Sequence, residues 1–85
     1  MSRDADTEAF IDTCIGPRRP GTIWFSGYDQ VRVEVLDVDR DPSGWMLWSI
    51  TEVDVEGSQR GWKRTHCTRW DYDRDRVVSQ PEMAR

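Results

Sequence analysis

Apolar and polar residues alternate along most of this 85-residue chain. The alternation is clearest in QVRVEVLDV, residues 30–38, where valines occupy every second position at the start of the segment. A two-residue period predicts a β-strand with one face toward a core. Four further strands are expected from shorter apolar runs, at residues 22–25, 45–55, 62–70 and 76–80.

Two of these segments contain a shift in the alternation. In 30–38, Leu36 and Val38 are out of phase with the valines that precede them. A β-bulge or strong coiling of the strand at Leu36 would turn both sets toward the core. In 45–55, a tryptophan and an isoleucine lie on one side of the strand and two later valines on the other, so a second break is expected near Thr51–Glu52.

Segments rich in glycine, proline and aspartate separate the strands. They leave no room for a helical crossover, so the sheet is expected to be antiparallel. Five short, bent strands predict an all-β (mainly β) fold, a small antiparallel five-stranded SH3-like barrel with a short N-terminal helix or arm, and an OB-type barrel is the near alternative. We expect a bend near Thr65–Thr68, because 62–70 is long for one strand of a small barrel.

The first residues follow a different pattern. TEAFIDTCIG, residues 7–16, spaces its apolar residues three and four apart, which is typical of a helix. Asp6 or Thr7 is the expected cap, and Gly16 followed by Pro17 is the expected stop. The predicted organisation is a helix or arm with a Pro/Gly linker in 1–20, a small barrel in 21–80 and a frayed tail in 81–85.

The charge distribution is uneven. The whole chain carries a net charge of −4 with a pI near 4.8, which argues against a typical nucleic-acid-binding domain. Residues 29–56 hold eight acidic residues and two arginines, whereas residues 57–70 hold four basic residues and no acidic ones. A charged partner responds to such local fields more than to the total charge.

The basic segment also carries aromatic residues, in GWKRTHCTRWDYD at 61–73. Aromatic rings could stack on bases or pack on a protein while the cations meet phosphates or acidic side chains. The alternative is that the tryptophans are core residues and that the cations balance the acidic strands. The predicted contact residues are Arg60, Trp62, Lys63, Arg64, Arg69, Trp70 and Tyr72, joined by Arg18 and Arg19 if the Pro/Gly segment lies nearby.

The sequence predicts no catalytic residue, metal site or cofactor. His66 and Cys67 are adjacent, so on a strand they face opposite ways and cannot pair, and their spacing matches no familiar zinc pattern. An enzyme would instead require a deep pocket that holds His66 together with a carboxylate. Cys14 and Cys67 are too few for a disulfide framework, and we expect a reduced, cytoplasmic chain.

One short stretch has a family resemblance. RPGTIWF, residues 19–25, resembles the opening strand of the PemK/MazF-type ribonuclease toxins, whose fold is also an SH3-like barrel. The resemblance covers these seven residues, and the rest of the chain shows no matching motif and lacks room for that family's longer loops and terminal helix. It therefore implies the barrel, and implies ribonuclease activity only weakly.

These patterns together favour a non-enzymatic binding or adaptor module. A protein partner is favoured because the total charge is acidic, and a nucleic-acid partner bound through 60–72 is the alternative. No apolar run approaches the ~20 residues of a membrane span, so no membrane partner is expected. The oligomeric state is left open between monomer and homodimer.

Overall fold

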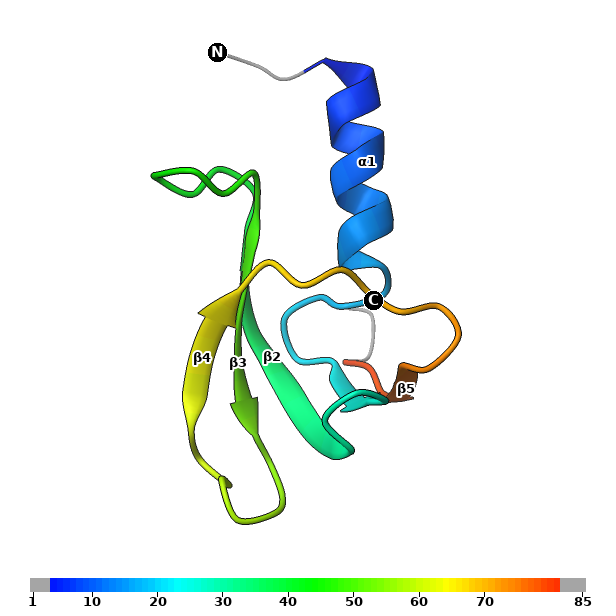
Figure 1. Cartoon of the computed structure of the whole chain (residues 1–85), viewed down its shortest axis with the longest axis vertical. Coiled ribbons are helices and arrows are strands. Elements are labelled where there is room, and N and C mark those ends of the chain that lie inside the picture. The colour runs from blue at the N-terminus through cyan, green and yellow to red at the C-terminus, as the bar shows by residue number, and fades with distance from the viewer. Residues whose placement is uncertain (1–3, 82–85) are drawn as a thin grey trace.

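The computed structural model describes residues 4–81, which form one short helix and five strands (Figure 1). In chain order these are α1 (Ala5–Ile15), β1 (Ile23–Ser26), β2 (Val31–Asp39), β3 (Ser49–Asp54), β4 (Lys63–His66) and β5 (Arg76–Ser79). All five strands form one antiparallel sheet in the order β4-β3-β2-β1-β5, which confirms the prediction of a mainly-β chain with five antiparallel strands and one short helix.

The sheet is not closed. β4 and β5 are its two edges, and within residues 4–81 they do not pair with each other. Closure into an SH3-like barrel therefore stays a prediction. Residues 82–85 of the expected tail lie outside the described residues.

Helix α1 ends where the sequence predicts and begins slightly earlier. Its cap is Asp4, whose Oδ1 accepts a hydrogen bond from the backbone N–H of Thr7 at 2.8 Å, so the expected caps Asp6 and Thr7 are instead helical residues. Gly16 ends the helix with a φ of 61°, and its N–H donates to the carbonyl oxygen of Asp12. A Cβ at Gly16 would lie 2.7 Å from Trp70, so the close contact also requires glycine.

Strand β2 contains the predicted bulge. Val35 pairs with Glu52 and Asp37 pairs with Thr51, which leaves Leu36 as the extra residue. The bulge restores Val38 to the inner side, where it packs against the core, while Leu36 itself is exposed. One inserted residue therefore accounts for the pattern shift in 30–38, but the expectation that Leu36 also turns toward the core is wrong.

Strand β3 differs from its prediction in length and in phase. It begins at Ser49 rather than at residue 45, and the preceding connection extends beyond the sheet (Figure 1). The expected break near Thr51–Glu52 is wrong, because the register shift at this point lies in β2. Ile50, Glu52 and Asp54 are all buried at alternating positions, so β3 turns two carboxylates inward and leaves its one valine, Val53, half-buried.

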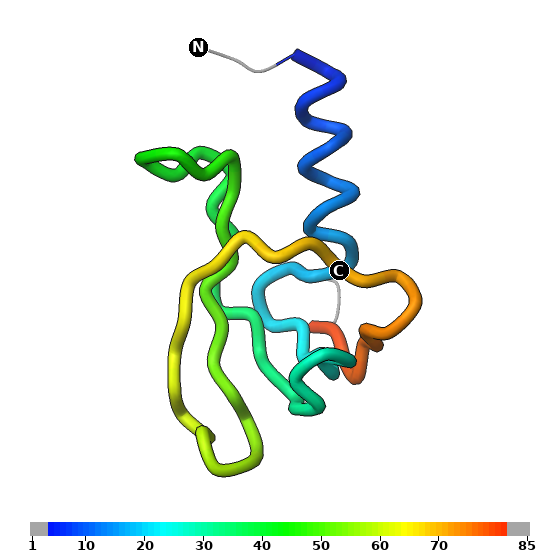
Figure 2. Tube along the Cα trace, in the orientation of Figure 1, coloured from blue at the N-terminus to red at the C-terminus, as the bar shows by residue number. Residues whose placement is uncertain are grey.

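The core lies between the helix end, the sheet and the long connection from β4 to β5. This connection runs from one edge of the sheet to the other past the end of α1 (Figure 2). It carries Trp70 into the core, where the backbone N–H of Trp70 donates to the carbonyl oxygen of Cys14 at 2.7 Å. The Trp70 ring packs against the Trp24 ring edge-on, with centroids 5.3 Å apart. The core consists of Ile11, Cys14, Ile15, Trp24, Val33, Val35, Trp48, Ile50 and Trp70.

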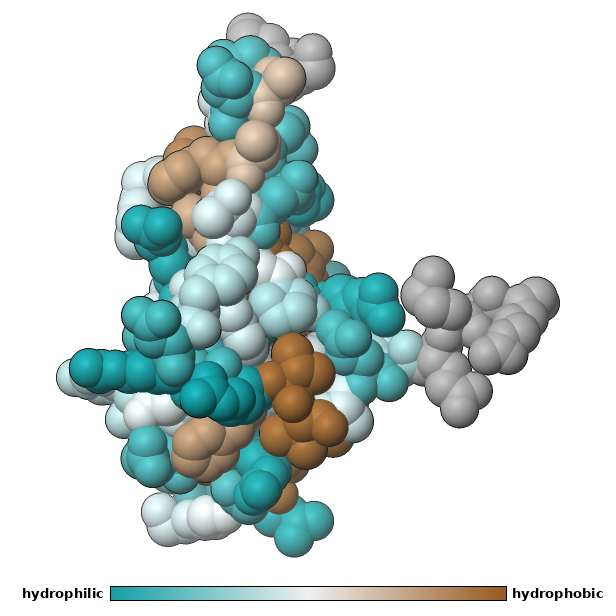
Figure 3. All heavy atoms as spheres, turned by 90° about the vertical axis from the view of Figure 1, so that its right-hand side faces the viewer, coloured by the Kyte–Doolittle hydropathy of each residue, from teal (hydrophilic) through white to brown (hydrophobic). Residues whose placement is uncertain are grey.

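Strand β5 forms a short, irregular edge. Its pairing with β1 shifts so that Val78 is an extra residue, and Val77 and Val78 are both exposed. Seen from the side that carries β5, much of the surface is hydrophilic, with one group of strongly hydrophobic atoms in its lower half and further apolar atoms in its upper part (Figure 3). A bulged, short edge strand is a poor template for regular strand pairing with another chain.

Candidate functional site

The site begins with the two inward carboxylates of β3. Glu52 and Asp54 are 1% and 4% exposed, and ionised groups at this depth require partners. The partners come from β4. Arg64 pairs in register with Glu52, and His66, two residues further along β4, pairs with Ile50. Antiparallel pairing thus places two basic side chains on the same inner face as two acidic ones.

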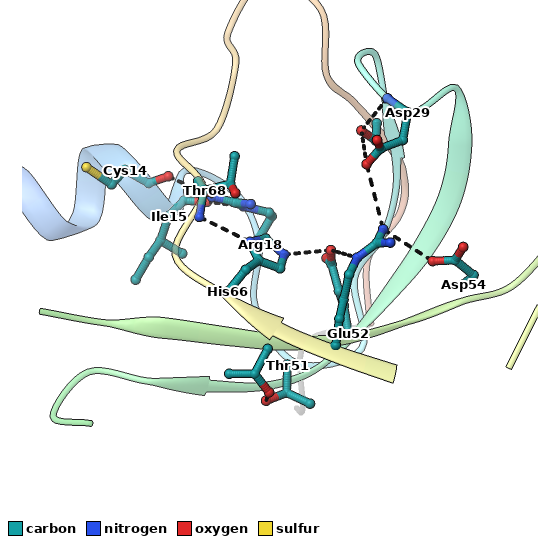
Figure 4. Close-up of polar contacts among 12 residues, drawn as sticks. Cys14, Ile15, Arg18, Asp29, Thr51, Glu52, Asp54, His66 and Thr68 are labelled. Carbon is teal, nitrogen blue, oxygen red and sulfur yellow. Dashed lines mark hydrogen bonds and ion pairs between the residues drawn. The ribbon is translucent and has the colours of Figure 1, made fainter. Parts of the chain in front are cut away.

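Glu52 and His66 form a short polar contact at the site. Nε2 of His66 lies 2.6 Å from Oε1 of Glu52 (Figure 4). The backbone N–H of Thr68 donates to Nδ1 of His66 at 3.1 Å, so Nδ1 is an acceptor and the proton is assigned to Nε2. The imidazole therefore donates from Nε2 to the Glu52 carboxylate, and protein groups occupy both of its ring nitrogens.

Burial raises the pKa of Glu52, but its partners outweigh this effect. Hydrogen bonds and electrostatic attraction from His66, and then from Arg64, stabilise the carboxylate. The pKa of Glu52 therefore lies below its ordinary value, and the group is ionised at neutral pH.

The Arg64 guanidinium is surrounded by three carboxylates. Its Nε donates to Oε1 of Glu52 at 3.2 Å, and its Nη2 lies 3.2 Å from Oδ1 of Asp54 and 3.8 Å from Oδ2 of Asp29 (Figure 4). The Asp54 contact is an ion pair without hydrogen-bond geometry. Arg64 thereby ties β3 to the turn between β1 and β2.

Two cavities flank Arg64 and Asp29, which line both. The larger has a volume of about 490 Å³ and reaches the β4–β5 connection, and the smaller, of about 340 Å³, reaches the β3–β4 turn. We call the two cavities and the Arg64–Asp29 pair between them the acidic groove. Its charged lining comprises two arginines, Arg64 and Arg69, and six acidic residues, Asp29, Glu52, Asp54, Glu56, Asp71 and Asp75.

Backbone contacts hold one wall of the acidic groove in place. The two carboxylate oxygens of Asp75 accept hydrogen bonds from the N–H groups of Gly27 and Asp71, each at 2.9 Å. This carboxylate joins the β1–β2 turn to the β4–β5 connection. Tyr28, at the tip of that turn, lines the larger cavity and is 85% exposed. Its ring is available for contact with a partner.

Most of the predicted contact residues are on the surface, and two are not. Arg60, Trp62, Lys63, Arg69, Tyr72 and Arg19 are exposed and Arg64 is half-buried, whereas Arg18 and Trp70 are buried. The burial of these last two corrects their expected place on a contact surface. Arg69 lies with its guanidinium carbon 5.9 Å from the Phe10 ring, and the Tyr72 hydroxyl donates to the carbonyl oxygen of Thr13. Arg69 and Tyr72 thus also contact α1.

Arg18 is a structural residue. Its Nε donates to the carbonyl oxygen of Ile15, and its Nη2 donates to those of Cys14 and Thr68. Its guanidinium carbon lies within 6 Å of the ring centroids of three tryptophans, Trp24, Trp48 and Trp70. Burial lowers the pKa of Arg18, and the charges of Glu52 and Asp75 oppose that shift. Arginine nevertheless stays protonated, because its ordinary pKa is far above neutrality.

The sequence reasoning missed the carboxylates of the acidic groove. The signal was present in β3, where Glu52 and Asp54 follow Ile50 at a two-residue spacing and therefore share its face. The valines at 53 and 55 were assigned to the core instead. The condition expected for an enzyme was a deep pocket that holds His66 with a carboxylate, and of this condition the structure shows the pairing, because His66 and Glu52 line the larger cavity together. However, His66 keeps no ring nitrogen for a substrate, because Glu52 and Thr68 engage both.

Comparisons with protein-family models, with curated proteins and with solved structures found no match. Within residues 4–81, no group of three or more histidine, cysteine, aspartate or glutamate side chains is placed to hold a metal ion. In the same part of the chain, no helix is both long and apolar enough to cross a membrane. Cys14 and Cys67 are free thiols.

Proposed function

We propose that the protein is a non-enzymatic binding module, built on a partly open SH3-like barrel, whose partner is a protein that presents a basic segment. The observation that carries the proposal is the charge of the acidic groove, because its lining contains six acidic residues and two arginines. A concave surface with one dominant sign of charge concentrates the field and attracts ligands of the opposite sign.

The acidic groove favours a cationic polypeptide over a polyanion. Nucleic-acid binding draws most of its affinity from cations that neutralise phosphates, and the carboxylates of the groove would repel those phosphates. An arginine or lysine side chain would instead gain charge-assisted hydrogen bonds with them. The exposed Tyr28 ring on the wall of the larger cavity adds a surface for packing or for a cation–π contact.

Two basic residues and one tryptophan near the β3–β4 turn form a second part of the proposed contact surface. Arg60, Trp62 and Lys63 are all exposed, and Lys63 begins the edge strand β4. Within residues 4–81, no strand pairs with the outer side of β4, so its main-chain groups are open to an extended segment of a partner. A partner would match both parts of the contact surface if its basic residues bound the acidic groove and its acidic residues contacted Arg60 and Lys63.

A nucleic-acid partner is the second candidate. Arg60, Trp62 and Lys63 lie within four residues and are exposed together, which suits base stacking combined with phosphate contacts. These three residues lie outside the lining of the acidic groove.

Binding of labelled probes to the full chain tests the two candidates. The probes are a short arginine-rich peptide, the same peptide with neutral citrulline in place of each arginine, and a single-stranded oligonucleotide, all followed by fluorescence anisotropy. We expect the arginine peptide to bind, its citrulline counterpart to fail and the oligonucleotide to bind more weakly than the peptide. Preferential binding of the oligonucleotide, lost in Lys63→Glu, would replace this proposal with the nucleic-acid one.

A further inference from the structure

Within the acidic groove, the Arg64 side chain contacts the carboxylates in the way that a cationic ligand would. Its side chain comes from the edge strand β4, is 37% exposed and ends among carboxylates from β3 and from the β1–β2 turn. The cavities on either side of it share Arg64 and Asp29 as lining residues. The guanidinium therefore occupies the point at which the two halves of the groove meet.

Arg64 does not satisfy all the groups around it. Glu52 is 1% exposed and lines the larger cavity, yet its Oε2 has no hydrogen-bond partner among residues 4–81. The contact from Arg64 to Asp29 is long, at 3.8 Å. Trp24 also lines this cavity, and its buried Nε1 likewise has no acceptor in the described part of the chain. Buried polar groups normally have partners, so these atoms mark unused binding capacity.

We propose that the place of the Arg64 guanidinium is a subsite for an arginine side chain of the partner, and that Arg64 is an internal occupant which that side chain displaces. The inference rests on the proposed function for the source of the arginine. The incoming guanidinium would take the contacts with Glu52, Asp54 and Asp29. A peptide carbonyl next to it is the kind of acceptor that Nε1 of Trp24 lacks.

Exchange of one guanidinium for another costs little. Arg64 is long, flexible and more than a third exposed, so it can turn toward solvent while the partner's side chain replaces its ion pairs. Arginine fits better than lysine, because a planar fork meets two carboxylates at once whereas an ammonium group acts as a point charge. In this arrangement Arg64 competes with the partner, so its removal strengthens binding. If Arg64 instead bound the phosphates of a nucleic acid, its removal would weaken binding of that partner.

The test uses the full chain with Arg64→Ala and, since this truncation could impair folding, with Arg64→Met, which keeps most of the aliphatic stem. The probe is N-acetyl-arginine methylamide, followed by NMR titration, and N-acetyl-citrulline methylamide is its neutral counterpart. If Arg64 holds the subsite most of the time, its removal raises affinity for the arginine probe about tenfold. The amide signals of residues 29, 52 and 54 shift, and the citrulline probe has no effect. Arg74→Ala, which removes an exposed arginine side chain outside both the groove and the proposed contact surface, leaves affinity unchanged.

The outcomes separate this inference from the proposed function. If a folded Arg64 variant binds the arginine probe no better than the wild type, or binds the citrulline probe equally well, the subsite is rejected. That result leaves the proposed function intact as long as the wild type binds the arginine-rich peptide. If the Arg64 variants bind the arginine probe but the wild type binds no basic peptide, the subsite stands and the proposed function fails.

Discussion

The guanidinium carbon of Arg18 lies 5.2 Å from the centroid of the Trp24 ring, inside the core of the protein. The same guanidinium donates to carbonyl oxygens at the end of α1 and in the β4–β5 connection. One buried cation therefore ties the end of α1 to the β4–β5 connection, whose Thr68 is 50 residues from Arg18 in the sequence. It also supports one end of the region that carries the acidic groove, because Thr68 accepts from Arg18 and lines the larger cavity.

Arg18→Lys should destabilise the protein. A lysine ammonium cannot reproduce three hydrogen bonds in a planar fork, and it is more strongly hydrated, so its burial costs more. We expect a loss of about 3 kcal/mol in the free energy of unfolding, measured by urea denaturation. The control is Arg19→Lys, because Arg19 is exposed and makes one long hydrogen bond, of 3.5 Å, to Pro81. Equal unfolding midpoints for the two variants would contradict a structural role for Arg18.

Glu52 should make stability depend on acidic pH. Its pKa in the folded protein lies below the ordinary value near 4.5, so as pH falls the unfolded chain takes up the proton first. The stabilisation is complete above that ordinary value and is lost as pH drops through the lower, folded-state pKa. Glu52→Gln should therefore reduce stability by about 2 kcal/mol at neutral pH and flatten the acid limb of the curve.

Urea denaturation of both proteins between neutral pH and pH 3 checks this prediction. Asp37→Asn serves as the control, because Asp37 is an exposed carboxylate of β2 and its removal should change little. Parallel stability curves for the wild type and Glu52→Gln below the ordinary pKa would show that the Glu52 contacts do not produce the pH dependence.

Gly27→Ala should disturb the wall of the acidic groove. A Cβ at this position would lie 2.5 Å from the carbonyl oxygen of Arg74, and a backbone atom cannot move aside as the end of a side chain can. The β1–β2 turn must shift away from the β4–β5 connection, which strains the hydrogen bond from Gly27 to Asp75. We expect a loss of about 2 kcal/mol in unfolding free energy and weaker binding of the arginine-rich peptide. Ser43→Ala, in the exposed β2–β3 connection and outside the groove, should be neutral, and a neutral Gly27→Ala would contradict the close contact.

Tyr28 and Trp45 offer a matched pair for locating the contact surface. Their exposed fractions are 85% and 84%, but only Tyr28 lines the acidic groove. Tyr28→Ala should weaken binding of the arginine-rich peptide by about five- to tenfold, as expected for the loss of one aromatic contact, and Trp45→Ala should leave it unchanged. Anisotropy titrations of both variants measure the difference. The reverse result would move the contact surface from the groove to the β2–β3 connection.

Local features of the fold could be predicted from the sequence because neighbouring residues determine them. Gly16 ends the helix since its backbone conformation suits glycine, and Leu36 forms a bulge since one residue too many separates two sets of inward valines. The same two-residue period indicated the strands. It did not indicate where the third strand begins, because Trp45 and Trp48 are alike in sequence and only the second finds a place in the core.

The sequence by itself determined a short helix followed by five antiparallel strands, because turn residues and apolar periods act over a few positions. Only the tertiary structure decided which face of β3 is inward and where each cation lies. Glu52 could turn inward because β4 brings Arg64 and His66 opposite it, and Arg18 could be buried because the distant β4–β5 connection supplies Thr68 and Trp70 around it. A buried charge is stable only with partners, and partners from distant segments meet only when the chain has folded.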